Sequence, residues 1–283
     1  MKKSLARLAP LLLLIGALAL PAPAYATSVN VAGRPIQGNI NTGHAGSCSG
    51  IGYGRVNGSL VVFLADHCRT GHSENEPGDP VMGPTGVVIG TWASIIPAIQ
   101  QHDLSYFWVN AAGTPGNANR IYRGDVAGSD FWEMTAQPSS ALSCDGEAEW
   151  GSDDIYQMNQ ISSETTEPYR TGSLPAEALS DLYTYYSYVT YSDGSTHCRI
   201  YTYDLPVRYA PNLHIESSSP IMKEAQSARL FAYATGMSNG CGGDCITITP
   251  IYNSLKAADD YWEVNGSNLG AYMCIDAACT PQP

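Results

Sequence analysis

The feature that most constrains the fold is a series of short apolar or aromatic runs separated by turn-forming residues. Each run has the length of a β-strand, and clusters of Gly, Asn, Asp and Pro stand between the runs. The clearest examples are SLVVFLA, GVVIGTW, LSYFWVN, RLFAYAT and CITITPI. Many of the 18 tyrosines also lie in alternating runs such as YTYYSYVTY. Long amphipathic helical patterns are nearly absent, and one helix is predicted for IYNSLKAADDYW near the end of the chain. The pattern is typical of an all-β sandwich or barrel.

The first 26 residues resemble a secretory signal peptide. They have a basic start, an apolar stretch and the small-residue ending AYA, so we expect cleavage after Ala26. A membrane anchor is the alternative, but the apolar stretch from Leu8 to Leu20 contains Pro10 and is short for a bilayer span. We therefore expect a secreted, extracellular protein whose mature chain has no membrane span.

Eight cysteines make disulfides the default expectation in an oxidising compartment. Cys241 and Cys245 lie close together in the chain, as do Cys274 and Cys279, and proximity suggests that each pair forms a bridge. No histidine lies near either pair, so no zinc site and no other metal site is expected. Connectivity does not follow from the sequence alone.

Size and charge narrow the function classes. Removing the first 26 of 283 residues leaves 257, enough for one large domain or two small ones. It also removes Lys2, Lys3 and Arg7, which takes the formal charge from −12 to −15. Such an acidic protein is a poor partner for nucleic acid or for an anionic membrane.

Three residues have the chemistry of a nucleophilic enzyme. His67 follows the apolar run of residues 59–65, and Asp103 precedes the run of residues 104–109, where its carboxylate can point back towards an imidazole. A histidine held by an aspartate can activate a serine, and Ser217 in IESSSP is the candidate. The alternative is structural: a strand-end histidine, a turn-capping aspartate and an exposed polar turn.

The motifs around these residues resemble the chymotrypsin-like serine proteases, in particular the secreted bacterial branch with the streptogrisins and α-lytic protease. CSGIGYGRVNGSLVVFLADHC is similar to that branch's C-[ST]-x-G-F…FLTAGHC, and VIGTWASIIPAIQQHDLSYFWV to its IG…GSSFPGNDYGIVR. IESSSP stands in the place of GDSGGP, and FAYATGMSNGCGGDCITITPIYNSLKA resembles the closing segment. The resemblance covers about residues 31–260 and is patchy between 112 and 195.

The resemblance implies two packed six-stranded antiparallel β-barrels with a catalytic cleft between them and a short C-terminal helix. We assign residues 27–125 to the first barrel, 126–262 to the second and 263–283 to a C-terminal extension, after the signal peptide of residues 1–26.

The resemblance also implies the site residues. His67 is the general base and then the acid, Asp103 orients and stabilises its imidazolium, and Ser217 is the nucleophile. The N–H groups of Ile215 and Ser217 form the oxyanion hole. The implied disulfides join Cys48 to Cys68 and Cys144 to Cys198. No cofactor is implied, the substrate is a protein or peptide, and the oligomeric state is open. No Asp stands where a Lys or Arg side chain would bind, so specificity is not trypsin-like.

Several residues depart from the family pattern. Ile215 stands in place of the glycine whose N–H is an oxyanion donor, and losing one donor costs on the order of 10²–10³-fold in turnover. Glu216 replaces Asp, Asp66 replaces Gly, and Ser218 adds a side chain where the pattern has Gly. On this basis Ser217→Ala should remove nearly all hydrolysis, whereas Ser218→Ala and Ser219→Ala should leave most of it.

Two functional hypotheses follow from the sequence. The first is a secreted, slow serine endopeptidase. The second is a catalytically impaired homologue that serves as a binding or adhesion protein. VAGRPI, which begins at Val31, resembles the family's mature start, so a second N-terminal cut stays open.

Overall fold

The computed structural model describes a large part of the chain, and the predicted signal peptide lies outside the described residues. Cys144, Ile215, Glu216, Ser217, Ser219 and Cys241 also lie outside them. The described residues are 35–37, 47–70, 76–83, 86–94, 102–122, 131–138, 155–158, 171–174, 183–190, 194, 196–206, 218, 220–223, 229–238, 245–264 and 270–281.

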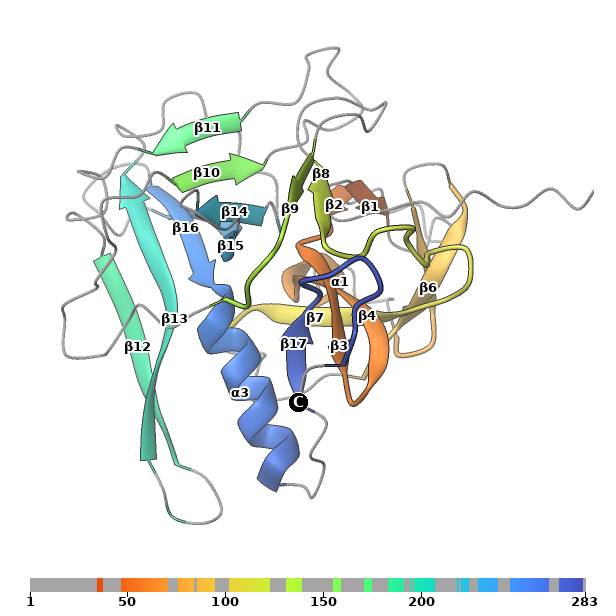
Figure 1. The fold of residues 1–283 in the computed structure, drawn as a ribbon. Coiled ribbons are helices and arrows are strands. Elements are labelled where there is room, and N and C mark those ends of the chain that lie inside the picture. Colours follow the sequence, from red (N-terminus) through yellow and green to blue (C-terminus); the bar gives the residue numbers. More distant parts are fainter. Residues whose placement is uncertain are drawn as a thin grey trace, which may run out of the picture.

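Among the described residues, the largest sheet is antiparallel and has eight strands, in the order β17-β3-β4-β7-β6-β5-β1-β2. Figure 1 shows β3, β4, β7 and β17 of this sheet near one another. Seven of its strands come from the first half of the chain. These seven are β1 Pro35–Gln37, β2 Ser47–Ser49, β3 Gly52–Val56, β4 Ser59–Ala65, β5 Pro80–Met82, β6 Val88–Trp92 and β7 Leu104–Val109. The eighth strand, β17 Ala271–Met273, comes from the end of the chain.

A second antiparallel sheet has seven strands, in the order β11-β10-β14-β15-β16-β13-β12. A two-stranded ribbon of β8 and β9 lies between the two sheets in the sequence. The bounds are β8 Arg120–Tyr122, β9 Phe131–Glu133, β10 Ile155–Met158, β11 Thr171–Leu174, β12 Tyr183–Thr190, β13 Thr196–Pro206, β14 Pro220–Lys223, β15 Arg229–Ser238 and β16 Cys245–Pro250.

Two helices complete the described structure. The short α1, His67–Thr70, follows β4 after one residue. The longer α3, Ile251–Val264, contacts β13, β15 and β16 of the seven-stranded sheet and β17 of the eight-stranded sheet. It therefore packs against both large sheets, as Figure 1 also shows for its position beside β17.

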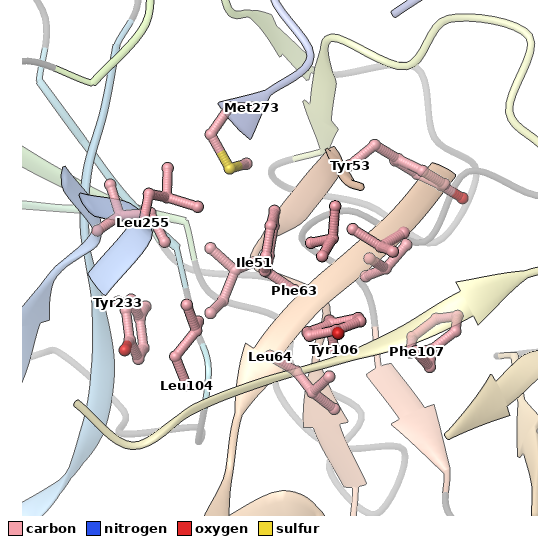
Figure 2. Packing of buried hydrophobic residues seen from close by; sticks show 14 of the residues in the cluster. Ile51, Tyr53, Phe63, Leu64, Leu104, Tyr106, Phe107, Tyr233, Leu255 and Met273 are labelled. Carbon is pink, nitrogen blue, oxygen red and sulfur yellow. The ribbon is translucent and has the colours of Figure 1, made fainter. Parts of the chain in front are cut away.

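One apolar core joins the two sheets. Residues of β3, β4 and β7 form a cluster with Leu230 and Tyr233 of β15 and with Ile251 and Leu255 of α3. Figure 2 shows Tyr233 beside Leu104 in this cluster. Each fully buried large apolar side chain contributes about 1.5–3 kcal/mol. The shared core therefore packs the second sheet against β4, which precedes His67, and against β7, which follows Asp103.

The C-terminal segment extends the first sheet. β17 pairs antiparallel with β3, and Arg55 Nε donates to the carbonyl oxygen of Cys279 at 2.7 Å. A side chain at Gly54 would place its Cβ 2.3 Å from the carbonyl oxygen of Tyr272, so only glycine permits this close pairing. The Cys274–Cys279 disulfide closes the loop after β17, as its spacing suggested.

The strand prediction from the sequence is confirmed and the strand count is not. SLVVFLA is β4 without change, and three other runs contain β6, β7 and β16. RLFAYAT is the first part of the longer β15, and IYNSLKAADDYW begins α3. In the part of the chain that the structure describes, the two large sheets have eight and seven strands, whereas the resemblance implied six strands in each barrel. In the first sheet β17 is an added edge strand, which covers the backbone N–H and C=O groups that β3 would otherwise leave unpaired. Within the described residues, the helices are too short or too polar to span a bilayer.

Candidate active site

His67 and Asp103 meet where two neighbouring strands of the first sheet come together. β4 ends at Ala65 and β7 begins at Leu104, and these two residues are register partners. His67 therefore follows the end of one strand, and Asp103 precedes the start of the strand beside it. Two segments 36 residues apart in the chain are brought together by ordinary antiparallel pairing.

Three hydrogen bonds join the two segments. The Nδ1 of His67 lies 2.6 Å from Oδ2 of Asp103, and the backbone N–H of His67 donates to Oδ1 at 2.8 Å. The backbone N–H of Asp66 donates to the carbonyl oxygen of Asp103, also at 2.8 Å. Asp103 has φ +50°, in the left-handed region that Asp tolerates better than most residues. This conformation lets one residue present both its carbonyl and its carboxylate to the histidine segment.

The carboxylate determines which tautomer the histidine adopts. An ionised Asp103 only accepts hydrogen bonds, so the neutral imidazole carries its proton on Nδ1. Nε2 is then an acceptor, with a lone pair available to take a proton from another group. The side chains of His67 and Asp103 are 38% and 30% exposed, so both are partly accessible from solvent.

The charge on His67 is stabilised by its neighbours. Burial lowers the pKa of His67, but the hydrogen bond and charge of Asp103 and the charge of Asp66 raise it, and the net shift is upward from 6.5. Asp66 is itself 5% exposed. Burial and the charge of Asp103 raise its pKa, against the opposing effects of Arg69, Ser105 and His67. A second carboxyl group therefore lies next to the histidine, where the family pattern has glycine.

The Cys48–Cys68 disulfide is present, as the resemblance implied. It joins β2 to the residue after His67, and both cysteines are buried. The sulfur atoms and a ring nitrogen of His67 lie within 4.8 Å of one another, a cluster with the composition of a metal site. Both sulfurs are oxidised in the disulfide, so neither is the thiolate that a metal would need.

Ser218 is the described residue of the serine segment, and its hydroxyl faces the protein interior. Its Oγ accepts a hydrogen bond from the backbone N–H of Ala65 at 2.6 Å and lies 3.2 Å from Sγ of Cys68. Ser218 is fully buried and has φ +68°. The segment predicted to carry the nucleophile is therefore attached to the strand end that carries His67. Ile215 and Ser217 themselves lie outside the described residues.

Tyr233 supports Asp103 from the second sheet. Its hydroxyl donates to the carbonyl oxygen of His102, the residue before Asp103, at 2.5 Å, and Ser254 Oγ lies 3.2 Å away. Tyr233 is fully buried, and burial raises its pKa well above 10.0, so the hydroxyl stays protonated as a donor. Nothing in the sequence suggested this contact, because it joins residues 131 positions apart.

Solved structures of bacterial chymotrypsin-like serine proteases are similar to this chain. Protease A of Thermobifida fusca is 15% identical with a TM-score of 0.43, over 81% of this chain and 95% of that one. A Nocardiopsis protease is 15% identical with a TM-score of 0.44, over 87% and 99%. A Cellulomonas bogoriensis chymotrypsin is 15% identical with a TM-score of 0.42, over 81% and 96%.

No protein-family model matches the chain, and no curated protein does.

Proposed function

We propose that this protein is a secreted serine endopeptidase that cleaves peptide bonds with Ser217 as nucleophile, His67 as general base and Asp103 as its orienting carboxylate. The observation that carries the proposal is the His67–Asp103 pair, with its two side-chain oxygens on the ring Nδ1–H and on the backbone N–H of the same histidine. A capping or purely structural aspartate has no need for both contacts.

The chemistry follows the acyl-enzyme route. Nε2 of His67 takes the hydroxyl proton of Ser217 as the oxygen attacks the substrate carbonyl, and Asp103 stabilises the imidazolium that forms. The N–H groups of Ile215 and Ser217 are proposed to hold the developing oxyanion. His67 then gives its proton to the leaving amine, and a water molecule releases the acyl group by the same steps in reverse. No step uses a metal ion or cofactor.

Ser217 is preferred over its neighbour on chemical grounds. The hydroxyl of Ser218 is fully buried and already accepts a hydrogen bond from Ala65. Ser217 precedes it by one residue and stands three residues before Pro220, as the nucleophile does in the family pattern. We propose that each large sheet closes into a barrel, with 27–125 and 126–262 as the two domains. Buried disulfides support a secreted, extracellular protein.

Labelling of the purified secreted protein with a fluorophosphonate tests the proposal. We expect one adduct, on the peptide that contains Ser217, and loss of both adduct and casein hydrolysis in Ser217→Ala. His67→Ala should lose both as well, with the folded structure checked by thermal melting. If wild type and Ser217→Ala hydrolyse casein and small esters equally poorly and no adduct forms, the alternative of a binding or adhesion protein replaces this one.

A further inference from the structure

We propose that Ser218 is a positioning residue: its hydroxyl holds the segment of the nucleophile against the end of β4, beside the general base. The inference rests on the proposed function, because it takes Ser217 as the nucleophile. Its central contact is the 2.6 Å hydrogen bond from the backbone N–H of Ala65 to Oγ of Ser218. Ala65 is the last residue of β4, two positions before His67.

The hydroxyl of Ser218 acts both as an acceptor and as a donor in the protein interior. It accepts from Ala65, and its own proton faces Sγ of Cys68 at 3.2 Å. Cys68 is in a disulfide and has no proton to give, so Ser218 is the donor of that weak contact. A hydroxyl that is fully buried and directed at two such partners holds its segment in place.

The backbone of Ser218 shows what the side chain adds. Its φ of +68° lies in the left-handed region, which glycine enters without steric cost and serine does not. The family pattern has glycine at this position. Serine at this position has a less favourable backbone conformation than glycine would have. Unlike glycine, it has a hydroxyl, which forms the hydrogen bond to β4.

The contact lies close to the base. Sγ of Cys68 is 3.2 Å from the Ser218 hydroxyl and 4.0 Å from Nε2 of His67. Fixing Ser218 to Ala65 therefore limits how far a nucleophile one peptide unit away can move from Nε2. Attack on a carbonyl is sensitive to such placement, since a displacement of about 1 Å can cost roughly 100-fold in rate. Although the sequence alone led us to expect that Ser218→Ala leaves most of the activity, this contact predicts a loss.

Two substitutions distinguish the effect of the Ser218 hydroxyl from the effect of its backbone conformation. Ser218→Gly removes the hydroxyl and relieves the strained φ, whereas Ser218→Ala removes the hydroxyl and keeps the strain. Asn119→Ala is the matched control. It also removes a buried hydrogen bond between a side chain and the backbone, the 3.0 Å bond from Asn119 Nδ2 to the carbonyl oxygen of Met134. Each protein is assayed for kcat and KM on a small ester, for the rate of fluorophosphonate labelling, and for thermal unfolding.

We expect kcat and the labelling rate to fall at least about tenfold in both Ser218 variants, with KM nearly unchanged. Ser218→Ala should melt below Ser218→Gly, and Asn119→Ala should lose stability but keep kcat. If wild type labels at Ser217 and Ser218→Gly matches it in kcat, the positioning role is wrong and the endopeptidase stands. The role is also wrong if Ser218→Gly no longer melts cooperatively, because the hydroxyl then holds the fold. If wild type neither labels nor hydrolyses, the proposed function fails and this role with it.

Discussion

Replacing Tyr233 by Phe tests whether the second sheet supports the acid of the His67–Asp103 pair. The change deletes one hydroxyl and keeps the ring in the core. It removes the 2.5 Å bond to the carbonyl of His102, which is itself 1% exposed. Loss of a bond to a buried backbone acceptor costs about 1–3 kcal/mol. For a chain of this size that corresponds to a fall in Tm of about 2–4 °C per kcal/mol.

Tyr53→Phe is the matched control for this prediction. Its hydroxyl donates to the carbonyl of Gly113 at 2.8 Å and its side chain is also buried. Both variants should lose a similar amount of stability in thermal or urea unfolding. Only Tyr233→Phe should also lower kcat, by several-fold to about tenfold, because His102 is bonded to Asp103 and a small shift there misplaces the carboxylate. Equal kcat in the two variants, or no loss of stability in Tyr233→Phe, would refute the reasoning.

Three further predictions concern the pH profile, the oxyanion loop and processing. His67 is a base only when neutral and its pKa is raised, so kcat/KM should reach half its maximum above pH 6.5, and the contribution of His67 to stability should be full below pH 6.5 and be lost as the pH rises through its raised pKa. Asp66→Asn removes a charge that raises this pKa, so it should move the rise of kcat/KM to lower pH. A rise of kcat/KM at unchanged pH would contradict this. Ile215→Gly should raise kcat by up to about 10²-fold if the backbone N–H of Ile215 is a poorly placed oxyanion donor. Steady-state kinetics that show no gain in kcat would mean that this donor does not limit turnover. Sequencing the N-terminus from culture supernatant should give Thr27 or Val31, and a start before Thr27 would show that the signal peptide is retained.

The local elements of the fold could be predicted from the sequence because their signals are local. The run of residues 59–65 is bounded by turn residues and its apolar side chains suit a buried central strand, so it forms β4. The helical pattern at residues 251–262 is similarly contained in one stretch of chain. His67 and Asp103 were candidates for the same reason: each stands directly beside such a strand.

The contacts that complete the site were decided by the tertiary structure. Ser218 meets Ala65 across 153 residues, and Tyr233 meets His102 across 131. These bonds depend on which strands become neighbours and on which groups are removed from water, and neither is encoded in the residues next to them. The position of β17 was also decided by the tertiary structure. This strand of three residues pairs with β3, where Gly54 lies close to Tyr272, and nothing in the sequence indicated that pairing. The sequence by itself predicted the candidate residues for the chemistry. The packing of the two sheets decided how His67, Asp103 and Ser218 are held, because hydrogen bonds between distant segments form only where a shared core brings those segments together.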